Sequence, residues 1–285
     1  MELIFKQGRH WQEFSSVTDL INFITDPKYH NPDAPTASHD GDMEWTGSGS
    51  FPEAINLARK GWPEGLAEIV RFVIKVEKLV MSYIPEPTTK FDVVGDVIDM
   101  GRFIEVDPEC MVSLVDGHNT KKIAQGKIVH VVLNIDAAGS SDIYTFFRRG
   151  AAGVALIDAL ERTGRRVIAD AIANTVSRSR LLETRIRVKN ADEHIQLDKL
   201  AFLFAHPSIL RRILFAAWER LPNDVRKLYG FHGSWGYGCV GHVPKEDQGD
   251  LYVDRLVGSY HKTEEEVTQY VLEQLRSQGV VIKED

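Results

Sequence analysis

Residues 127–173 read KIVHVVLNIDAAGSSDIYTFFRRGAAGVALIDALERTGRRVIADAIA, and this stretch decides the fold class. Its first part, 128–135, is a nearly continuous apolar run, which is typical of a strand buried on both faces of a parallel sheet. After a loop of small residues, apolar positions recur at helical spacing over 143–160. Gly164 is suited to ending that helix, and a second apolar strand starts at Arg166. A strand, helix and strand of this length predict a right-handed crossover between parallel strands.

The remainder of the second half continues the alternation of strands and helices. Alternating residues over 184–188 predict a strand, which we expect to be antiparallel and at an edge of the sheet. Two apolar helices are predicted within 197–221, a strand at 251–257 and a final helix at 263–277. We therefore predict that residues 126–285 form a Rossmann-like three-layer α/β domain.

The first half, residues 1–125, is predicted to be a separate and largely helical region. It opens with a short strand or arm over 1–15. Proline and glycine punctuate 26–49, which predicts a surface loop. A capping box and helical spacing predict a pair of helices over 50–80, and extended segments are expected over 90–116.

Composition places the chain among ordinary globular proteins. Of the 285 residues, 43% are hydrophobic and 26% are charged, and the formal net charge is −7. The two cysteines, Cys110 and Cys239, are too few for a disulfide framework, which indicates a reducing compartment. The N-terminus lacks the pattern of a secretory signal peptide, and no apolar run reaches the ~20 residues that a membrane helix needs. We therefore expect a cytoplasmic protein that does not enter a membrane.

The loop after the first predicted strand carries carboxylate and hydroxyl side chains, among them Asp136 and Ser140. At the carboxyl end of a parallel strand and the start of a helix, such groups are placed to bind a ligand. A second interpretation is that Ser141 or Asp142 only caps the helix. The element order of about residues 126–282 resembles the von Willebrand factor A family, in which an Asp-x-Ser-x-Ser motif binds magnesium.

Within this resemblance, Asp136 matches the aspartate of the motif and Ser140 its second serine, whereas Ala138 stands in place of the first serine. Asp254, near the end of a later predicted strand, is the remaining candidate ligand. The resemblance implies magnesium as a cofactor at Asp136. An enzyme that depends on a divalent metal at Asp136 is one hypothesis for the function. Such hard cations need several oxygen ligands, and the replaced serine removes one of them.

A second resemblance is carried by four segments: SFPEAINLARKGWPEG, MGRFIEVDPECMV, RRGAAGVALIDALERTGRRV and FAHPSILRRILFAAWE. They resemble an uncharacterised family carried by tailed phages and prophages. This resemblance spans most of the chain and implies a phage gene product, without implying an activity.

Positive charge is concentrated between residues 145 and 190. This stretch contains ten Arg or Lys against four Asp or Glu, an excess of +6, which leaves −13 on the rest of the chain. Nine of the ten are arginine, which suits forked contacts to phosphate groups. One interpretation is a surface that binds nucleic acid or an acidic protein, and the other is a solvated face paired with acidic neighbours. The candidate binding residues are Arg148, Arg149, Arg165, Arg166, Arg178, Arg180, Arg185 and Arg187.

The glycine-rich stretch HGSWGYGCVGH is expected to form a loop. Trp235 and Tyr237 are candidate anchors for a partner, because large aromatic side chains often dominate binding energy. His232, Cys239 and His242 offer an alternative, a zinc site, which would need a fourth ligand from elsewhere.

These features favour a non-enzymatic binding or assembly protein of phage origin, because the sequence contains no complete active-site motif. We expect it to act through contacts with a protein partner or with a second copy of itself. Nucleic-acid binding through residues 148–189 and divalent-metal chemistry at Asp136 are the alternatives.

Overall fold

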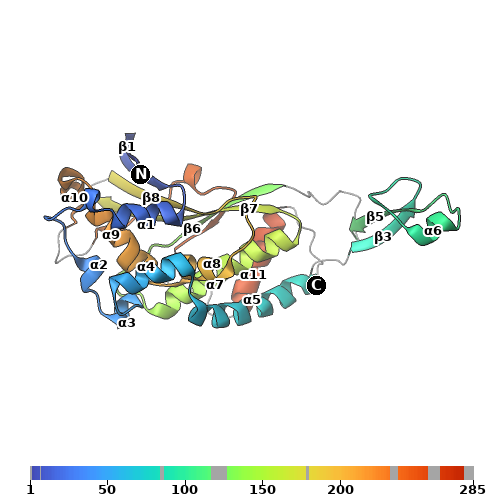
Figure 1. Ribbon diagram of the computed structural model, residues 1–285, viewed down its shortest axis with the longest axis horizontal. Helices are drawn as coiled ribbons and strands as arrows, with labels where there is room; N and C mark the ends of the chain where they lie inside the picture. Colours follow the sequence, from blue (N-terminus) through green and yellow to red (C-terminus); the bar gives the residue numbers. More distant parts are fainter. Residues whose placement is uncertain are drawn as a thin grey trace.

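The computed structural model describes residues 2–6, 8–83, 87–116, 127–177, 180–231, 237–255 and 264–278. The chain is a mixed α/β protein around a seven-stranded mixed sheet of order β1-β2-β8-β7-β6-β10, in which β9 also pairs with β7 (Figure 1). The strands of this sheet are β1 (Glu2–Lys6), β2 (Arg9–Phe14), β6 (Ile128–Asn134), β7 (Arg166–Ser177), β8 (Arg180–Lys189), β9 (Cys239–Val240) and β10 (Leu251–Val253).

The predicted strand, helix and strand are confirmed at the centre of this sheet. β6 and β7 are parallel neighbours joined by the helix α7 (Ile143–Arg162). Asp142 caps α7 by accepting a hydrogen bond from the backbone N–H of Thr145 at 2.7 Å, as the capping interpretation of the loop predicts. Gly164 follows the helix with a φ of 80°, a left-handed conformation that glycine adopts without strain.

The strand β8 is antiparallel to β7, as predicted, but its predicted position at the edge of the sheet is wrong. β2 pairs with it in parallel, from Arg9 opposite Leu181 to Phe14 opposite Ile186, and β1 forms the edge. Pairing between residues so distant in sequence leaves no local signal in either strand. One hydrophobic core contains side chains from both sides of residue 125. The division into two domains at this position stays a prediction.

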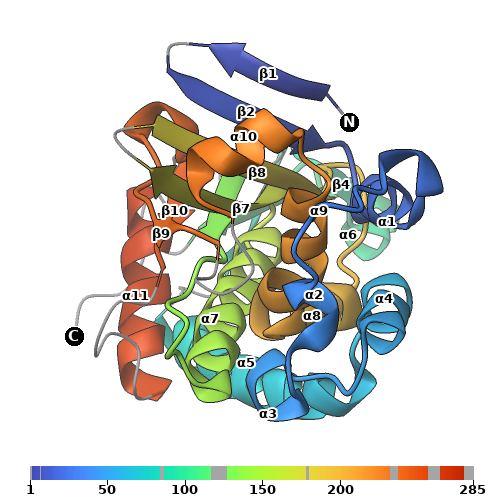
Figure 2. The same cartoon turned by 90° about the vertical axis from the view of Figure 1, so that its left-hand side faces the viewer.

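The large helices gather on one face of the sheet, as Figures 1 and 2 show for α5 (Pro63–Tyr83), α7 and α8 (Leu197–Ala205). Alternate residues of β6, including Val131 and Leu133, enter the core on this side. On the other face, the short helix η3 (Lys245–Asp247) lies against polar side chains of β8. The predicted three-layer arrangement, with helices covering both faces, is therefore not confirmed.

The predicted helical pair of the first half is confirmed as α4 (Phe51–Lys60) and α5. Ser50 caps α4 by accepting a hydrogen bond from the backbone N–H of Glu53 at 3.3 Å. Five further helices belong to the body: α1 (Val17–Thr25), the π-helix η2 (Ile209–Leu214), α9 (Phe215–Glu219), α10 (Asn223–Tyr229) and α11 (Glu264–Ser277).

The segment 26–49, predicted as a surface loop, lies at the surface, with Ser38, Thr46 and Ser48 as its buried residues, but it also contains short helices. Arg212 holds it by donating hydrogen bonds to the backbone carbonyls of Gly41 at 2.7 Å and Ser48 at 2.9 Å. The sequence gives no local sign of this anchor, because the guanidinium lies 164 positions after Ser48 in the chain. Its short helices are η1 (Pro27–Tyr29), α2 (Ala37–Asp40) and α3 (Met43–Thr46).

A second, three-stranded antiparallel sheet of order β3-β5-β4 forms an arm, which we define as residues 87–116. Figure 1 shows the arm projecting from the body. The expected extended segments are thus confirmed, and Arg102 of the arm stacks on the ring of Phe91 with 3.7 Å between its Cζ and the ring centroid. The elements of the arm are β3 (Pro87–Asp92), β4 (Val97–Ile98), α6 (Met100–Ile104) and β5 (Met111–Asp116).

No single helix in the described ranges is long and apolar enough to cross a membrane. One pair, α8 together with residues 209–219, passes the same test by length and composition, and it is bent by 70°.

Candidate functional site

A pocket of about 200 Å³ lies near the carboxyl ends of β6 and β7. Its lining comes from distant parts of the chain, including Trp45 in the first half, Asp136 after β6, Asn174 in β7 and Cys239 in β9. The carboxyl ends of parallel strands are where α/β sheets commonly hold ligands. This pocket is therefore the first candidate site of the body.

Four aromatic side chains form the apolar wall of the pocket: Trp45, Phe215, Trp218 and Tyr237. Phe215 and Tyr237 are stacked, with their ring centroids 4.0 Å apart. The polar groups of Trp45 and Tyr237 form hydrogen bonds inside the protein. Trp45 Nε1 donates to the carbonyl of Gly139 at 2.9 Å, and the Tyr237 hydroxyl donates to Glu219. The wall therefore offers ring surfaces rather than polar groups.

Asp136 is the acidic group of this pocket and is only 3% exposed. Its Oδ2 accepts the backbone N–H of Asn174 at 2.8 Å, and Asn174 Nδ2, in the orientation that satisfies its neighbours, donates to the same oxygen at 2.8 Å. Burial raises the pKa of Asp136 to about 8, against the opposing effects of the Asn174 hydrogen bond and of the Arg149 charge. A strongly shifted acid in a pocket is a recurrent mark of functional sites.

Two buried arginines hold the segments around the pocket together. Arg149 donates to the carbonyl of Asp136 at 2.6 Å, and burial lowers the pKa of Arg149 to about 10. Arg211, within the π-helix η2, donates to the carbonyls of Trp45 at 2.6 Å and Ser141 at 2.7 Å. It thus ties the first half of the chain to the loop after β6. Local π-helical geometry is frequent at functional sites.

Arg211 and the aromatic wall as a unit are not predicted from the sequence, which indicates only Tyr237 among the wall residues. The signal that was available is the pair Arg211 and Arg212 inside the otherwise apolar stretch FAHPSILRRILFAAWE. Charged groups in a buried helix need polar partners, so this pair predicts nearby backbone carbonyls. It does not predict which carbonyls, because those belong to residues distant in sequence.

The predicted magnesium ligands do not form a ligand set. Ser140 is exposed, and Asp254 is exposed after β10, where it accepts a hydrogen bond from the Tyr252 hydroxyl at 3.0 Å. Asp136 is buried, with its Oδ2 bound by Asn174. In the described part of the chain, no group of three or more His, Cys, Asp or Glu side chains is suited to hold a metal ion. These residues therefore do not fit a hard divalent cation, which needs several oxygen ligands.

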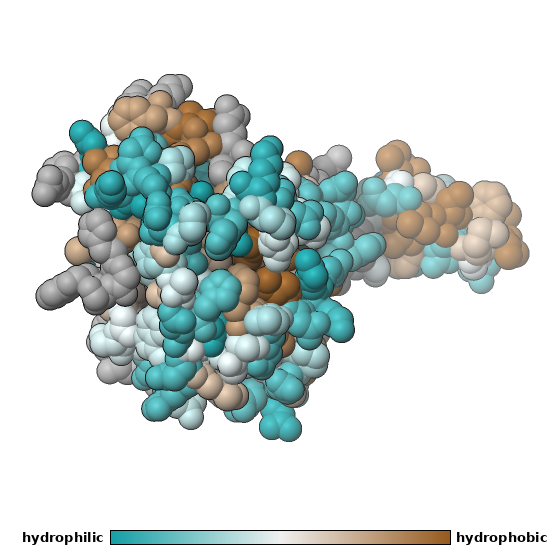
Figure 3. Space-filling model, turned by 60° about the vertical axis from the view of Figure 1, so that its left-hand side comes forward, coloured by the Kyte–Doolittle hydropathy of each residue, from teal (hydrophilic) through white to brown (hydrophobic). Residues whose placement is uncertain are grey.

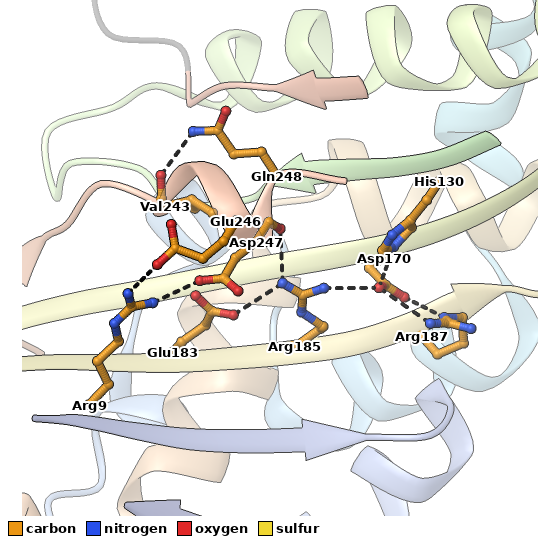
Figure 4. A network of polar contacts seen from close by, with 10 residues as sticks. All are labelled: Arg9, His130, Asp170, Glu183, Arg185, Arg187, Val243, Glu246, Asp247 and Gln248. Atoms are coloured by element: carbon orange, nitrogen blue, oxygen red, sulfur yellow. Dashed lines mark hydrogen bonds and ion pairs between the residues drawn. The ribbon is translucent and has the colours of Figure 1, made fainter. Parts of the chain in front are cut away.

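The face of the sheet opposite the large helices carries a network of charged side chains (Figure 4). At its centre, Asp170 is 1% exposed, and its Oδ2 lies 2.7 Å from His130 Nε2 and 3.5 Å from Arg185 Nη1. Arg187 also donates to the Asp170 carboxylate. Although burial opposes it, the hydrogen bonds from His130 and Arg187 hold the pKa of Asp170 below its ordinary value.

Glu183 extends this network toward η3. It is fully buried, its Oε1 lies 3.3 Å from Arg185 Nη2, and its Oε2 lacks a hydrogen-bond partner among the described residues. Burial raises the pKa of Glu183 to about 7, with the nearby Arg185 charge opposing the shift. Arg9 of β2 reaches the same region, where it donates to Asp247 at 2.8 Å and to Glu246 at 2.5 Å.

The predicted binding arginines therefore separate into different environments. Arg149 and Arg165 are buried and are not available on this surface, since Arg165 donates to the carbonyl of Gln278 at 2.9 Å. Arg185 and Arg187 pair with Asp170, in accordance with the interpretation of the cluster as arginines paired with acidic neighbours.

Arg148, Arg166 and Arg180 are exposed. Arg166 begins β7 and Arg180 follows its other end, so these two lie at opposite ends of a twelve-residue strand. The two β-strand arginines among these exposed candidates are therefore not gathered at one place on the surface. Arg178 lies outside the described residues.

The glycine-rich stretch is only partly described. Tyr237 is buried in the aromatic wall, so it is not the exposed partner anchor that the sequence predicts. Of the alternative zinc ligands, Cys239 and His242 are exposed, whereas His232 and Trp235 lie outside the described residues.

The arm carries an apolar surface that the sequence analysis missed. Fourteen large hydrophobic side chains are exposed in the described part of the chain, and eight of them fall within residues 93–106. Figure 3 shows hydrophobic residues gathered on the projecting part of the molecule. The eight are Val93, Val94, Val97, Ile98, Met100, Phe103, Ile104 and Val106, which we call the arm patch.

Together, these features define a mixed α/β protein with a polar sheet face, a small aromatic pocket and an arm with an apolar patch. A family model described as a domain of unknown function, DUF7192, matches residues 7–281, and the chain belongs to this family. This match covers most of the chain, which is also the extent of the resemblance to an uncharacterised family that the sequence predicts. No curated protein and no solved structure matches the chain.

Proposed function

We propose that this protein is a binding or assembly protein that docks to a protein partner through the arm patch. The observation that supports this is the concentration of exposed apolar side chains between Val93 and Val106. Contiguous exposed apolar surface is unfavourable in water and marks interaction sites, because a partner can remove it from water.

The backbone of the arm patch adds to this argument. Val106 has a φ of 61°, the one positive φ among the described non-glycine residues, and its side chain is 86% exposed. A β-branched residue in this region is strained, by about 1–3 kcal/mol. The free energy of an isolated arm is raised both by this backbone strain and by the exposed apolar side chain. Docking to a partner would remove the side chain from water and so offset the second contribution.

The charge around the arm patch narrows the class of partner. Residues 87–116 contain seven Asp or Glu and two Arg or Lys, a net charge of −5. Two arms brought together would face each other with like charges, which disfavours a symmetric arm-to-arm dimer. The favoured partner is a different protein with an apolar groove and a basic rim.

Site-specific photocrosslinking tests this proposal. A benzophenone side chain at Val106 is expected to crosslink one discrete protein in the native cells, identified by mass spectrometry. Ile104→Glu should abolish that crosslink, because it places a charge in the desolvated centre of the contact. The matched control is the same side chain at Tyr144, which is 70% exposed on the body. Crosslinks only to a second copy, or the same products from both positions, would contradict the proposal.

Nucleic-acid binding through residues 148–189 is the second proposal, supported by the exposed Arg148, Arg166 and Arg180. The separation of Arg166 from Arg180 makes it weaker than docking through the arm. An origin in tailed phages, a von Willebrand A-like relationship for 126–285 and a cytoplasmic location also stand as proposals. The phage origin rests on the sequence resemblance. The von Willebrand A-like relationship is supported by the order β6-α7-β7 with an antiparallel β8. The cytoplasmic location rests on composition.

A further inference from the structure

The pocket near the ends of β6 and β7 has the size of a single aromatic ring. Its volume is about 200 Å³. An apolar protein cavity of about 150 Å³ is sufficient to bind benzene. The pocket therefore admits one ring with a small substituent, and it is too small for a nucleotide or another drug-sized ligand, which occupies roughly 300–1,000 Å³.

The polar groups around this pocket are committed, with one exception. Thr175 Oγ1 donates to the carbonyl of Tyr237 at 3.0 Å, and Arg211 donates to the carbonyls of Trp45 and Ser141. Asp136 Oδ2 accepts two hydrogen bonds from Asn174. Among the described residues, the hydrogen bonds to the Asp136 carboxyl go to Oδ2, and none goes to Oδ1.

We propose that this pocket binds a small aromatic amine or single-ring nitrogen heterocycle, whose ring packs on the aromatic wall and whose nitrogen hydrogen-bonds to Asp136 Oδ1. The aromatic wall supplies the contact surface for a planar ring, since its own N–H and O–H groups point to partners elsewhere. The nitrogen would bond to the Asp136 oxygen that takes no hydrogen bond from the residues the structure describes.

Other ligand classes fit less well. A hydrocarbon ring would cover Asp136 Oδ1 without offering it a hydrogen bond, which is unfavourable for a carboxyl oxygen. An anion would lie beside the Asp136 carboxyl. It would gain no hydrogen bond from Arg211 in return, because Arg211 donates to the backbone carbonyls of Trp45 and Ser141. The site is independent of the arm patch, so its ligand and the docking proposal stand or fall separately.

The two cysteines provide a direct readout with the full chain. Cys239 is exposed and lines the pocket, whereas Cys110 belongs to the arm and serves as the internal reference. The rate of alkylation of each thiol by iodoacetamide is measured by mass spectrometry, with 2-aminopyridine or toluene as the probe. We expect 2-aminopyridine to slow alkylation of Cys239 at least threefold and to leave Cys110 unchanged, while toluene protects Cys239 less at the same concentration.

Asp136→Asn supplies the matched variant, because the amide keeps an oxygen for the Asn174 N–H and replaces the carboxyl group. It should raise the half-protecting concentration of 2-aminopyridine about tenfold. Asp254→Asn, the same change after the neighbouring parallel strand, should leave it unchanged. The wild-type comparison of the two probes stands even if the Asp136 variant does not fold. Absence of protection, or equal protection by 2-aminopyridine and toluene, would overturn the proposal.

Discussion

At the scale of single residues, the buried Glu183 of the sheet face makes its own contribution to the pH dependence of stability. Glu183 has its pKa raised from an ordinary value of 4.5 to about 7. The folded state therefore holds its proton more tightly than the unfolded state. Stability is greatest below about pH 4.5, falls as the pH rises toward about 7, and is constant above that for this group. One pKa unit corresponds to about 1.4 kcal/mol, so the loss is at most roughly 3 kcal/mol.

Glu183→Gln removes this titration. At pH 8 we expect the variant to have a higher free energy of unfolding than the wild type, by about 1–3 kcal/mol, and the two to converge near pH 4. Urea unfolding at both pH values measures this. Glu193→Gln is the control with opposite sign, because a backbone hydrogen bond from Asn190 holds the pKa of Glu193 below its ordinary value. A wild type more stable than Glu183→Gln at pH 8 would refute this account.

At the scale of elements, the crossing of α7 and α8 depends on a glycine. A methyl group at Gly150 would lie 2.4 Å from the Cα of Ala205, and that backbone cannot move without displacing α8. Gly150→Ala should lower the free energy of unfolding by about 1–3 kcal/mol, even though alanine favours a helix more than glycine. Gly139→Ala is the matched control, since a Cβ there meets nothing within 4 Å. Equal melting temperatures of the two variants would exclude this packing role.

At the scale of the whole molecule, the arm and the body are separate in their packing. The strands of the arm pair only with one another in the described sheets, and none of residues 89–113, whose burial is described, belongs to the hydrophobic core. Replacing 87–116 by a short Gly/Ser linker should therefore change the free energy of unfolding of the body by less than about 0.5 kcal/mol.

Removal of residues 2–14 is the contrasting deletion, because it exposes the edge of β8 that β2 covers and takes Phe14 from the core. That deletion should destabilise the body by several times as much as the arm replacement does. Thermal unfolding followed by circular dichroism compares the stability of the two deletion variants. If the body is unfolded once residues 87–116 have been replaced, the arm and the body are not separate in their packing.

The sequence by itself determined the central strand, helix and strand, because their signals are local. The apolar run of β6, the cap at Asp142 and the glycine after α7 each act within a few residues. The mixed α/β class follows from that alternation. The exposed arm patch was not predicted, because only the isolation of the arm from the core shows that its apolar residues stay in water.

Only the tertiary structure decided the neighbours of β8, the burial of Arg149 and the assembly of the aromatic pocket. Each depends on contacts beyond the local pattern, from the 13 positions between Asp136 and Arg149 to the 166 positions between Trp45 and Arg211. An arginine in a sequence has the same local pattern whether it faces water or a buried carbonyl, because its environment is created by chain folding. The residues that surround the pocket therefore became a site only when the distant segments met.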